Sequence, residues 1–300
     1  MPTFFTSRGD DGDRSIMRGT RSIIFMAGLV LSGFMQSSMA DTITVCLDGT
    51  CDYSNPTEAA NAAVPGDVVE IAAGTYLLEE PVESYGVQMT IRGAVDSSGE
   101  PATILDGQGV LIVLGTVGAD QAVFENLVIT NGYGDYGGGA SFTASTGVTV
   151  RNCHFVGNHA NWNGGGVRLS LDTTLTLSDC VISGNTADHP QWGGQSYGAG
   201  IHNSGAVVTL VRTRVCENLE SADPGRQVSG SSPVNQGGCI EDDCNSCNTT
   251  DQADLDFNGS IDVVDLLLLL DSWAGSGIAD IDNSGVVDVA DVLLLLSRWS

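Results

Sequence analysis

The sequence predicts an all-β protein, a parallel β-helix of stacked coils, followed by a small α-helical module that binds calcium. Two observations predict the β-helix: an eleven-residue phrase recurs along the chain, and a glycine-rich phrase recurs between its copies. A third observation predicts the C-terminal module. Runs of alternating aspartates occur twice near the end of the chain, each followed by a leucine-rich segment.

The first 40 residues have the organisation of a secretory signal peptide. Arg18 and Arg21 precede an apolar run at residues 23–34, and small residues at 38–40 supply a cleavage site. The run is shorter than the roughly 20 residues that cross a bilayer, and no later segment approaches that length. Met17 is the expected true start, because a signal peptide does not normally begin with an acidic stretch. We therefore expect a secreted or cell-surface protein without a membrane span after cleavage.

The mature chain is strongly acidic. Four of the 11 basic and three of the 37 acidic residues lie within residues 1–40, which leaves 7 basic and 34 acidic residues, a net charge of −27. Such a surface repels polyanions, so nucleic acid is excluded as a partner. Lysine is absent, which also excludes chemistry that needs an amine nucleophile.

The repeats set the predicted architecture. The longer phrase occurs as AVFENLVITNG at 122–132, VTVRNCHFVGN at 148–158, LTLSDCVISGN at 175–185 and, more loosely, VTLVRTRVCEN at 208–218. The glycine-rich phrase occurs as GGGASF at 137–142, GGGVRL at 164–169, GAGIHN at 198–203 and GGCIED at 237–242. Each repeat of about 27 residues thus carries two short strands, and about six coils are recognisable. Units of this size cannot bury their own apolar faces and must stack.

Alternation within the longer phrase predicts which side chains enter the core. If the phase slips by one residue at Asn152, then Val150, Cys153 and Phe155 point inward and His154 points outward. The Gly-Asn pair that ends the phrase is expected to supply a left-handed or tight turn where the chain leaves the strand.

These phrases also support a family comparison. FVGN, ISGN and VCEN, with GGGA, GGGV and GAGI, resemble the FxxN and GGAI repeats of chlamydial-type polymorphic outer membrane proteins. PGDVVEIAAGTY at 65–76 and ATILDGQG at 102–109 are similar to the opening coils of the pectate-lyase-like superfamily. The resemblance implies a right-handed parallel β-helix over residues 41–248.

A short helix is expected to cover the N-terminal end of the coils. Asn55, Pro56 and Glu58 have the pattern of an N-cap, a first-turn proline and a capping-box glutamate ahead of an alanine-rich stretch.

The cysteines fall into three groups. Cys46 and Cys51 flank a tight segment, and because an exported chain favours oxidation they are expected to form a disulfide. Cys153 and Cys180 take the same inward position on neighbouring coils, where buried thiols are expected in preference to a disulfide. For the local group at 216, 239, 244 and 247, disulfides are expected, with a zinc site as the alternative.

The C-terminal repeat has the pattern of two EF-hand calcium loops, DLDFNGSIDVVD at 254–265 and DIDNSGVVDVAD at 280–291. Oxygen-bearing side chains alternate, a glycine permits the sharp turn, and an aspartate closes each loop. The predicted Ca²⁺ ligands are Asp254, Asp256, Asn258, Ser260 and Asp265 in the first loop and Asp280, Asp282, Ser284, Val286 and Asp291 in the second, with the backbone carbonyl used at Ser260 and Val286.

A duplicated pair of loop-helix units in an exported protein resembles the dockerin modules that attach polysaccharide-degrading enzymes to scaffolds. The resemblance covers residues 249–300 and implies calcium-dependent attachment to a protein partner. Leucine runs at 266–270 and 293–296 stand where dockerins usually present polar and basic residues to cohesin. The two helices therefore either bury their leucines on each other or keep part of this surface for a partner or the cell envelope.

Two outward columns of the predicted β-helix are candidates for catalysis. The register predicts Ser141, Arg168 and His202 in one column, and residues 125, 151 and 178 in another, without the acidic cluster that a lyase or hydrolase needs. Arg168 beside His202 is the one pairing that suggests acid-base chemistry.

Aromatic residues gather at one corner of the predicted coils, before the glycine-rich strands. Tyr136, Trp162 and Trp192 are expected on successive coils with Tyr197 beside them, and such rings bind sugars through C–H contacts to their faces. The alternative is that they pack on one another as a spine. We expect binding to an extracellular polysaccharide, or adhesion to a cell-surface component, with a polysaccharide lyase or glycoside hydrolase as the alternative function.

Overall fold

The computed structural model describes residues 40–188, 197–220, 227–244, 253–255, 260–275, 279–282, 284 and 286–299. The predicted signal peptide, including Met17, lies outside these residues up to position 39. Among the described residues, no helix is both long enough and apolar enough to cross a membrane.

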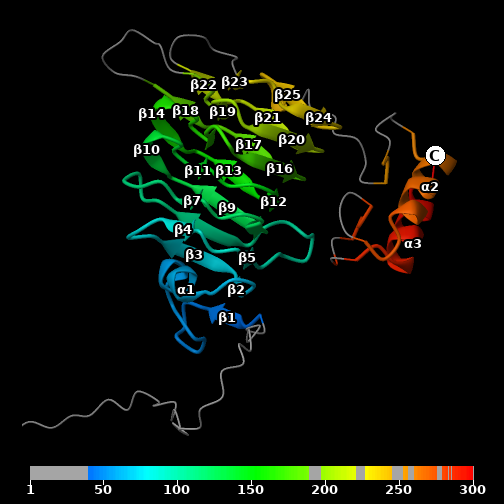
Figure 1. Ribbon diagram of the computed structural model, residues 1–300, viewed down its shortest axis with the longest axis horizontal. Helices are drawn as coiled ribbons and strands as arrows, with labels where there is room; N and C mark the ends of the chain where they lie inside the picture. The colour runs from blue at the N-terminus through cyan, green and yellow to red at the C-terminus, as the bar shows by residue number, and fades with distance from the viewer. Residues whose placement is uncertain are drawn as a thin grey trace, which may run out of the picture. The chain divides into compact units, whose positions relative to one another are not determined.

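The chain forms a parallel β-helix, and every pairing between its strands is parallel (Figure 1). Sheet A contains β1 (Thr42–Val45), β2 (Val68–Ile71), β5 (Thr90–Gly93), β8 (Val123–Glu125), β12 (Val148–Arg151), β16 (Thr174–Ser178), β20 (Val207–Val211) and β24 (Val234–Gln236). Sheet B contains β3 (Gly74–Leu77), β6 (Thr103–Asp106), β9 (Leu127–Thr130), β13 (His154–Val156), β17 (Val181–Ser183), β21 (Arg214–Cys216) and β25 (Cys239–Glu241).

Two further sheets complete each turn. Sheet C contains β10 (Tyr133–Tyr136), β14 (His159–Asn163), β18 (Thr186–Ala187) and β22 (Leu219–Glu220). Sheet D contains β4 (Val82–Tyr85), β7 (Leu114–Val117), β11 (Ala140–Thr143), β15 (Val167–Leu169), β19 (Ile201–Asn203) and β23 (Val228–Gly230). Strands β2 to β23 make six complete turns, which agrees with the number of coils expected.

The expectation of two strands per repeat is wrong. The four turns from β8 to β23 carry four strands each, and the two earlier turns carry three. The strands of sheet C escaped notice because they do not alternate apolar and polar residues: β10 reads Tyr-Gly-Asp-Tyr, and none of its residues is buried. Their pairing depends on the neighbouring turn and leaves no local pattern.

The alternation predicted for the longer phrase is confirmed. Val150, Cys153 and Phe155 are fully buried, whereas His154 is only partly covered. The slip in phase has a backbone cause, since Asn152 lies in the left-handed region with φ 47°. Asn126, Asp179 and Arg212 take the same conformation at the same corner of their turns. The corner therefore reverses the pleat between sheets A and B in each of these four turns.

The two residues of the Gly-Asn pair have different structural roles. Gly157 and Gly184 supply the left-handed turn, with φ of 69° and 64°. Asn158 and Asn185 instead point inward and are buried, and each Oδ1 accepts a hydrogen bond from the backbone N–H of the turn before, at 2.8 and 3.0 Å. The asparagine side chain thus pairs with a buried backbone N–H group of the preceding turn that would otherwise lack a hydrogen-bond acceptor.

One copy of the glycine-rich phrase was assigned to the wrong sheet. GGCIED at 237–242 was expected to repeat the strand that is now placed in sheet D, but β25 pairs with β21 in sheet B, with Cys239 opposite Arg214. Gly237 is left-handed, with φ 67°, and bridges to Val211. It therefore occupies the corner between sheets A and B, one turn beyond Arg212.

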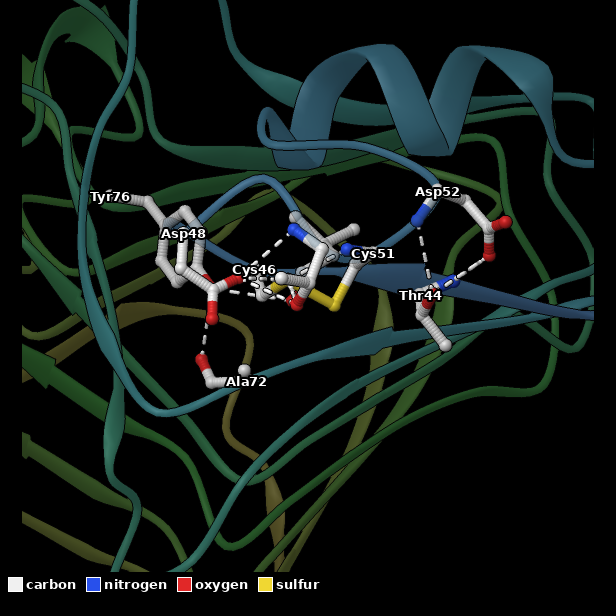
Figure 2. The surroundings of a disulfide bond; sticks show 9 residues. Thr44, Cys46, Asp48, Cys51, Asp52, Ala72 and Tyr76 are labelled. Carbon is white, nitrogen blue, oxygen red and sulfur yellow. Dashed lines mark hydrogen bonds between the residues drawn. A yellow bond between two sulfur atoms is a disulfide. The ribbon is translucent and has the colours of Figure 1, made fainter.

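The N-terminal end is covered by helix α1 (Pro56–Ala62), as predicted. Asn55 caps it by accepting a hydrogen bond from the Thr57 N–H at 2.8 Å, and Pro56 opens the first turn. The Cys46–Cys51 disulfide closes the loop after β1 (Figure 2). Beside it, the Thr44 hydroxyl donates to Asp52 Oδ2 at 2.7 Å.

Disulfides also occur at the C-terminal end of the β-helix. Cys216 pairs with Cys244, and Cys239 is disulfide-bonded as well, so these three cysteines offer no thiolate to zinc. Cys247 lies outside the described residues. Cys153 and Cys180 are free and buried, as expected.

The C-terminal segment has its own hydrophobic core and two helices, α2 (Val263–Asp271) and α3 (Val289–Ser297). Both helices begin with a capping box, in which Asp262 and Asp288 are the N-caps and Asp265 and Asp291 return the bond. Of the two leucine runs, only Leu269 and Leu295 are fully buried in this core.

Candidate functional site

The aromatic corner is built by sheet C, whose strands place side chains of successive turns in register. Tyr136 of β10 stacks on Trp162 of β14, with ring centroids 6.4 Å apart and planes inclined by 13°. Tyr133 stacks in the same way on His159, at 5.5 Å and 14°. The two strands are adjacent and parallel, so one turn of the helix supplies each ring with its neighbour.

Both tyrosines remain exposed at this corner, but the stacked ring faces cover one another. The surface left to solvent therefore includes ring edges and polar atoms. Tyr197 is also exposed and its N–H donates to Asn163 Oδ1 at 3.1 Å, which joins it to the same corner. Trp192 lies outside the described residues.

Arg168 reaches over this corner from sheet D. Its Cζ lies 5.4 Å from the centroid of the Tyr136 ring, a distance at which a cation is attracted to an aromatic face. Arg92, Arg151 and Arg212 all pair with carboxylates. In the described part of the chain, the guanidinium of Arg168 makes no ion pair or hydrogen bond.

Hydrogen-bond acceptors lie on the same corner. Asp135, exposed on β10, accepts a hydrogen bond from Asn161 Nδ2 at 2.9 Å. The Tyr133 hydroxyl exchanges hydrogen bonds with the Asn161 side chain at 2.9 and 3.2 Å. Among the described residues, the corner thus combines guanidinium donors that have no ion pair with carboxylate, amide and phenol groups.

The outward column that contains Arg168 and His202 is confirmed by the strand register. Ser141 is opposite Arg168, Arg168 is opposite His202, and His202 is opposite Ser229. His202 Nδ1 lies 2.8 Å from the Ser229 hydroxyl. Burial, and secondarily the nearby Arg168 charge, lower the pKa of His202, so the neutral imidazole is favoured.

A second outward column lies on sheet A. The sequence predicted only the part of it at residues 125, 151 and 178. Glu70, Arg92, Glu125 and Arg151 are opposite one another on successive strands and form a row of alternating charge. Arg92 pairs with Glu70 at 3.2 Å and with Glu125, and Glu125 also pairs with Arg151. Alternating signs at the coil period could have revealed this row, whereas nothing local could have shown that Arg168 lacks a partner.

The second predicted calcium loop brings three carboxylates together. Oxygen atoms of Asp280, Asp282 and Asp291 all lie within 4.8 Å of one another. Asp280 and Asp291 are buried, and Asp291 accepts hydrogen bonds from three backbone N–H groups, those of residues 281, 282 and 288. Ser284 N–H donates to Asp280 at 2.9 Å and to Asp282 at 3.0 Å, which folds the loop back on the cluster. This oxygen-only donor set fits a hard cation such as Ca²⁺.

The described residues of the first predicted calcium loop have the same arrangement as their counterparts in the second loop. Asp254 and Asp265 are buried, and Asp265 accepts from the Leu255 N–H at 2.6 Å and from the Asp262 N–H at 2.8 Å. Ser260 and, in the second loop, Val286 are exposed. Asp256 and Asn258 lie outside the described residues.

No protein-family model matches this chain, and no curated protein matches it. Among solved structures it is similar to pectate lyase Pel9A, with 17% identity and a TM-score of 0.45 over 61% of this chain and 49% of that one. It is similar to YbhC of Escherichia coli, with 12% identity and a TM-score of 0.43 over 66% and 61% of the two chains. Pectin methylesterase of Aspergillus niger shares 13% identity, with a TM-score of 0.34 over 70% and 87%.

The chain spans about half the length of Pel9A and less than two thirds of YbhC. Likeness at these identities concerns the fold alone. The parallel pairing of the strands establishes that fold without it.

Proposed function

We propose that this is an exported, polysaccharide-binding protein that acts outside the cell or at its surface. The glycan lies on the corner formed by Tyr136, Trp162 and Arg168, and the C-terminal module, stabilised by calcium, serves for attachment. The observation that carries the proposal is the guanidinium of Arg168, which has no ion pair with any described residue and is held over a stacked aromatic pair in a chain with a large excess of carboxylates.

The chemistry of the corner favours a neutral polysaccharide. A guanidinium offers five N–H donors and no acceptor, while Asp135 offers only acceptors when ionised. Sugar hydroxyls both donate and accept, so one chain of sugars can satisfy both groups. The excess of carboxylates over arginines opposes the approach of a polyanionic chain. The exposed edges of the rings add apolar contact.

Affinity measurements on two separate arginine variants, one at the corner and one control, test the proposal. Insoluble neutral polysaccharides, such as cellulose, chitin and xylan, are compared with pectate for retention of the protein. Arg168→Gln should weaken binding to the retained polymer about tenfold or more, because hydrogen bonds to charged groups contribute about 1.5–3 kcal/mol. Arg214→Gln is the matched control, since Arg214 also lacks an ion pair among the described residues but lies on sheet B.

Two results would contradict the proposal. One is that no polysaccharide retains the protein; the other is that Arg168→Gln and Arg214→Gln bind equally well. Trp162→Ala should weaken binding by roughly 1–3 kcal/mol if the ring contacts the sugar. If the stacked rings only support the corner, the same change should lower the melting temperature instead.

A polysaccharide lyase or glycoside hydrolase is the second candidate function, because Arg168 and His202 are neighbours in one outward column. An assay for new reducing ends or unsaturated products on any retained polymer decides between binding and cleavage. Release of products that stops in His202→Gln would favour the enzyme.

Calcium binding is proposed on the cluster formed by Asp280, Asp282 and Asp291, together with the duplicated first loop. Isothermal titration of the metal-free protein with Ca²⁺ should show two sites. Asp291→Asn should remove one of them, and unchanged stoichiometry in this variant would count against the assignment.

A further inference from the structure

Ser229 and His202 form a hydrogen-bonded serine–histidine pair on the outward face of sheet D. The two residues are opposite each other on the adjacent strands β23 and β19, and His202 Nδ1 lies 2.8 Å from the Ser229 hydroxyl oxygen. A serine hydroxyl within hydrogen-bond reach of an imidazole is the arrangement that activates serine as a nucleophile. The contact therefore raises the question of whether this pair performs acyl transfer.

His202 is suited to accept the proton of the serine hydroxyl. Burial, and secondarily the positive charge of Arg168, lower the pKa of His202. The imidazole is therefore mainly neutral at pH 7, as a general base must be. When its single proton is on Nε2, Nδ1 accepts the hydrogen bond that the Ser229 hydroxyl donates.

The backbone beside Ser229 leaves room for its side chain. A Cβ atom at Gly198 would lie 2.6 Å from the Ser229 hydroxyl oxygen, so a residue with a side chain would displace the serine. Gly198 also has a φ of 64°, in the left-handed region. Ser229 is 8% exposed, so its hydroxyl is largely shielded from water. We therefore expect a small acyl group, such as acetyl, to reach this oxygen in preference to a long chain.

Arg168 places a positive charge beside the serine–histidine pair. It is opposite His202 on β15, which puts it two strands, or roughly 10 Å, from Ser229 at the backbone. Its guanidinium has no ion pair with any described residue. Ester cleavage passes through a tetrahedral intermediate with a negatively charged oxygen, which N–H donors of a guanidinium stabilise. The column thus holds a nucleophile, a base and a cation in order.

A second histidine–hydroxyl contact lacks this combination. On sheet C, His159 Nδ1 lies 2.8 Å from the Thr186 hydroxyl. The same register continues to Tyr133 on one side and Leu219 on the other, and neither carries a positive charge. The threonine oxygen is also attached to a branched carbon, which hinders its attack on a carbonyl. The hydrogen bond alone is therefore not the argument; the cation beside it distinguishes the pair on sheet D.

We propose that Ser229, His202 and Arg168 hydrolyse acyl esters on the polysaccharide that the protein binds. The substrate class is an O-acetylated neutral polysaccharide. The inference rests on the proposed function, because Arg168 belongs to both sites: its guanidinium lies over Tyr136 at the aromatic corner, and its strand adjoins that of His202. A sugar held at the corner therefore presents its acyl substituent to the neighbouring turns of sheet D.

The reaction proceeds in two steps, with water as the co-reactant. In the first, Ser229 Oγ attacks the ester carbonyl carbon while His202 Nδ1 takes the hydroxyl proton. The bond from that carbon to the sugar oxygen then breaks, and His202 returns the proton to this oxygen. In the second step, water attacks the acyl-serine and gives a proton to His202. Ser229 leaves with that proton, and acetic acid is released. Arg168 stabilises the oxyanion in both steps.

Acetate release from acetylated xylan by the mature protein tests the activity. Ser229→Ala and His202→Gln should each lower the rate about a hundredfold or more, because general base catalysis contributes about 10²–10⁴-fold. Ser183→Ala and His154→Gln are the matched controls, since both residues lie on the outward face of sheet B, and they should keep the unmodified rate. Thermal unfolding followed by circular dichroism verifies that the variants are folded.

Covalent labelling examines the serine in the unmodified protein. A fluorophosphonate is attacked at phosphorus by an activated serine, with loss of fluoride, and mass spectrometry of peptides should find the adduct on Ser229. His202→Gln should prevent the labelling. If the hydrogen bond is purely structural, Ser229 stays unlabelled and no acetate is released, and that result would overturn the proposal. Acetate release that persists in Ser229→Ala would overturn it as well.

A small soluble ester separates this inference from glycan binding. Hydrolysis of 4-nitrophenyl acetate needs no polysaccharide, so Arg168→Gln should lower its kcat through loss of the oxyanion donor alone. Ser229→Ala should lose this hydrolysis and keep full retention on the insoluble polymer. Retention without any ester hydrolysis refutes the esterase and leaves the glycan corner standing. Hydrolysis by a protein that no polysaccharide retains would overturn the polysaccharide as substrate and the proposed function with it.

Discussion

One position of the core carries a polar atom in most turns. The first residue on the sheet B side of the corner between sheets A and B is Thr103, Leu127, Cys153, Cys180 or Thr213 in successive turns. The threonine hydroxyls donate to backbone carbonyls of the preceding turn at 3.0 Å, and the Cys180 thiol lies 3.5 Å from the Val150 carbonyl in the same way. The buried cysteines thus stand where threonines stand in other turns, which is a packing role for a weak S–H donor.

These thiols should be unreactive in the folded protein. Burial raises the pKa of Cys153 to about 12 and also raises that of Cys180, so almost no thiolate is present at neutral pH. Iodoacetamide at pH 8 should leave both residues unmodified in the native protein and label both after unfolding, as read by mass spectrometry of peptides. Rapid labelling without denaturant would show that the core opens far more readily than its burial indicates.

Stability should decrease as the pH falls below about 6.5, the ordinary histidine pKa. Burial lowers the pKa of His154 and His202 in the folded state. Between the unfolded and folded pKa values, the unfolded chain binds protons that the folded chain does not, so the free energy of unfolding rises with pH in this window. Urea unfolding at pH 7 and pH 5.5 measures the difference in the free energy of unfolding between the two pH values. The double variant His154→Gln with His202→Gln should show a smaller difference, and an unchanged difference in that variant would contradict the assignment.

At the scale of the elements, a row of buried amides ties the turns together. Asn158, Asn185 and Asn218 follow strands of sheet B, and Gln227 ends the row. Each asparagine Nδ2 donates to a main-chain carbonyl of the preceding turn, for example Asn185 to Phe155 O at 2.8 Å. Every member is therefore satisfied at both ends, which a buried polar network requires.

Removal of one member should therefore be costly. Asn185→Ala removes the Oδ1 atom that accepts hydrogen bonds from the Asn158 N–H and from Asn158 Nδ2 in the core, and should lower the free energy of unfolding by about 2–4 kcal/mol. Asn235→Ala is the control, because Asn235 is exposed and bonds only to Gly238. A change below 1 kcal/mol at Asn185, measured by urea unfolding, would mean that water replaces the amide.

At the scale of the whole molecule, the chain has two separate hydrophobic cores of very different size. The β-helix core runs through all the turns, whereas eight of the described residues form the C-terminal core. Four buried aspartates belong to the same module. Carboxylates held this close together repel until a cation neutralises them. The two parts should therefore respond differently to loss of calcium.

Chelation should unfold the C-terminal module and spare the β-helix. In excess chelator, hydrogen exchange of the full chain should lose the protection of α2 and α3 while the strands of sheets A and B keep theirs. Asp291→Asn in Ca²⁺ should reproduce part of this loss. Equal protection of both helices with and without chelator would show that the module does not need a metal to fold.

Local patterns in the sequence are sufficient to predict much of this structure. The inward positions of Val150 and Phe155, the slip at Asn152 and the cap helix all depend on neighbours within a few residues, and the repeat period follows from comparing such short phrases along the chain. Period-two alternation and helix capping involve residues of a single strand or a single helical turn, so the sequence alone predicts them. The duplicated aspartate loops were recognised for the same reason.

Other features depend on which turns become neighbours, and only the tertiary structure decided them. Sheet C has no alternation, and its strands exist because residues 26 or 27 positions apart pair across turns. Gly237 lies at the corner between sheets A and B because residues 234–236 pair with β20 in sheet A and residues 239–241 pair with β21 in sheet B. Among the described residues Arg168 has no ion pair, because the fold directs their acidic side chains elsewhere. Partners in space are set by loop lengths and register, which no single segment contains.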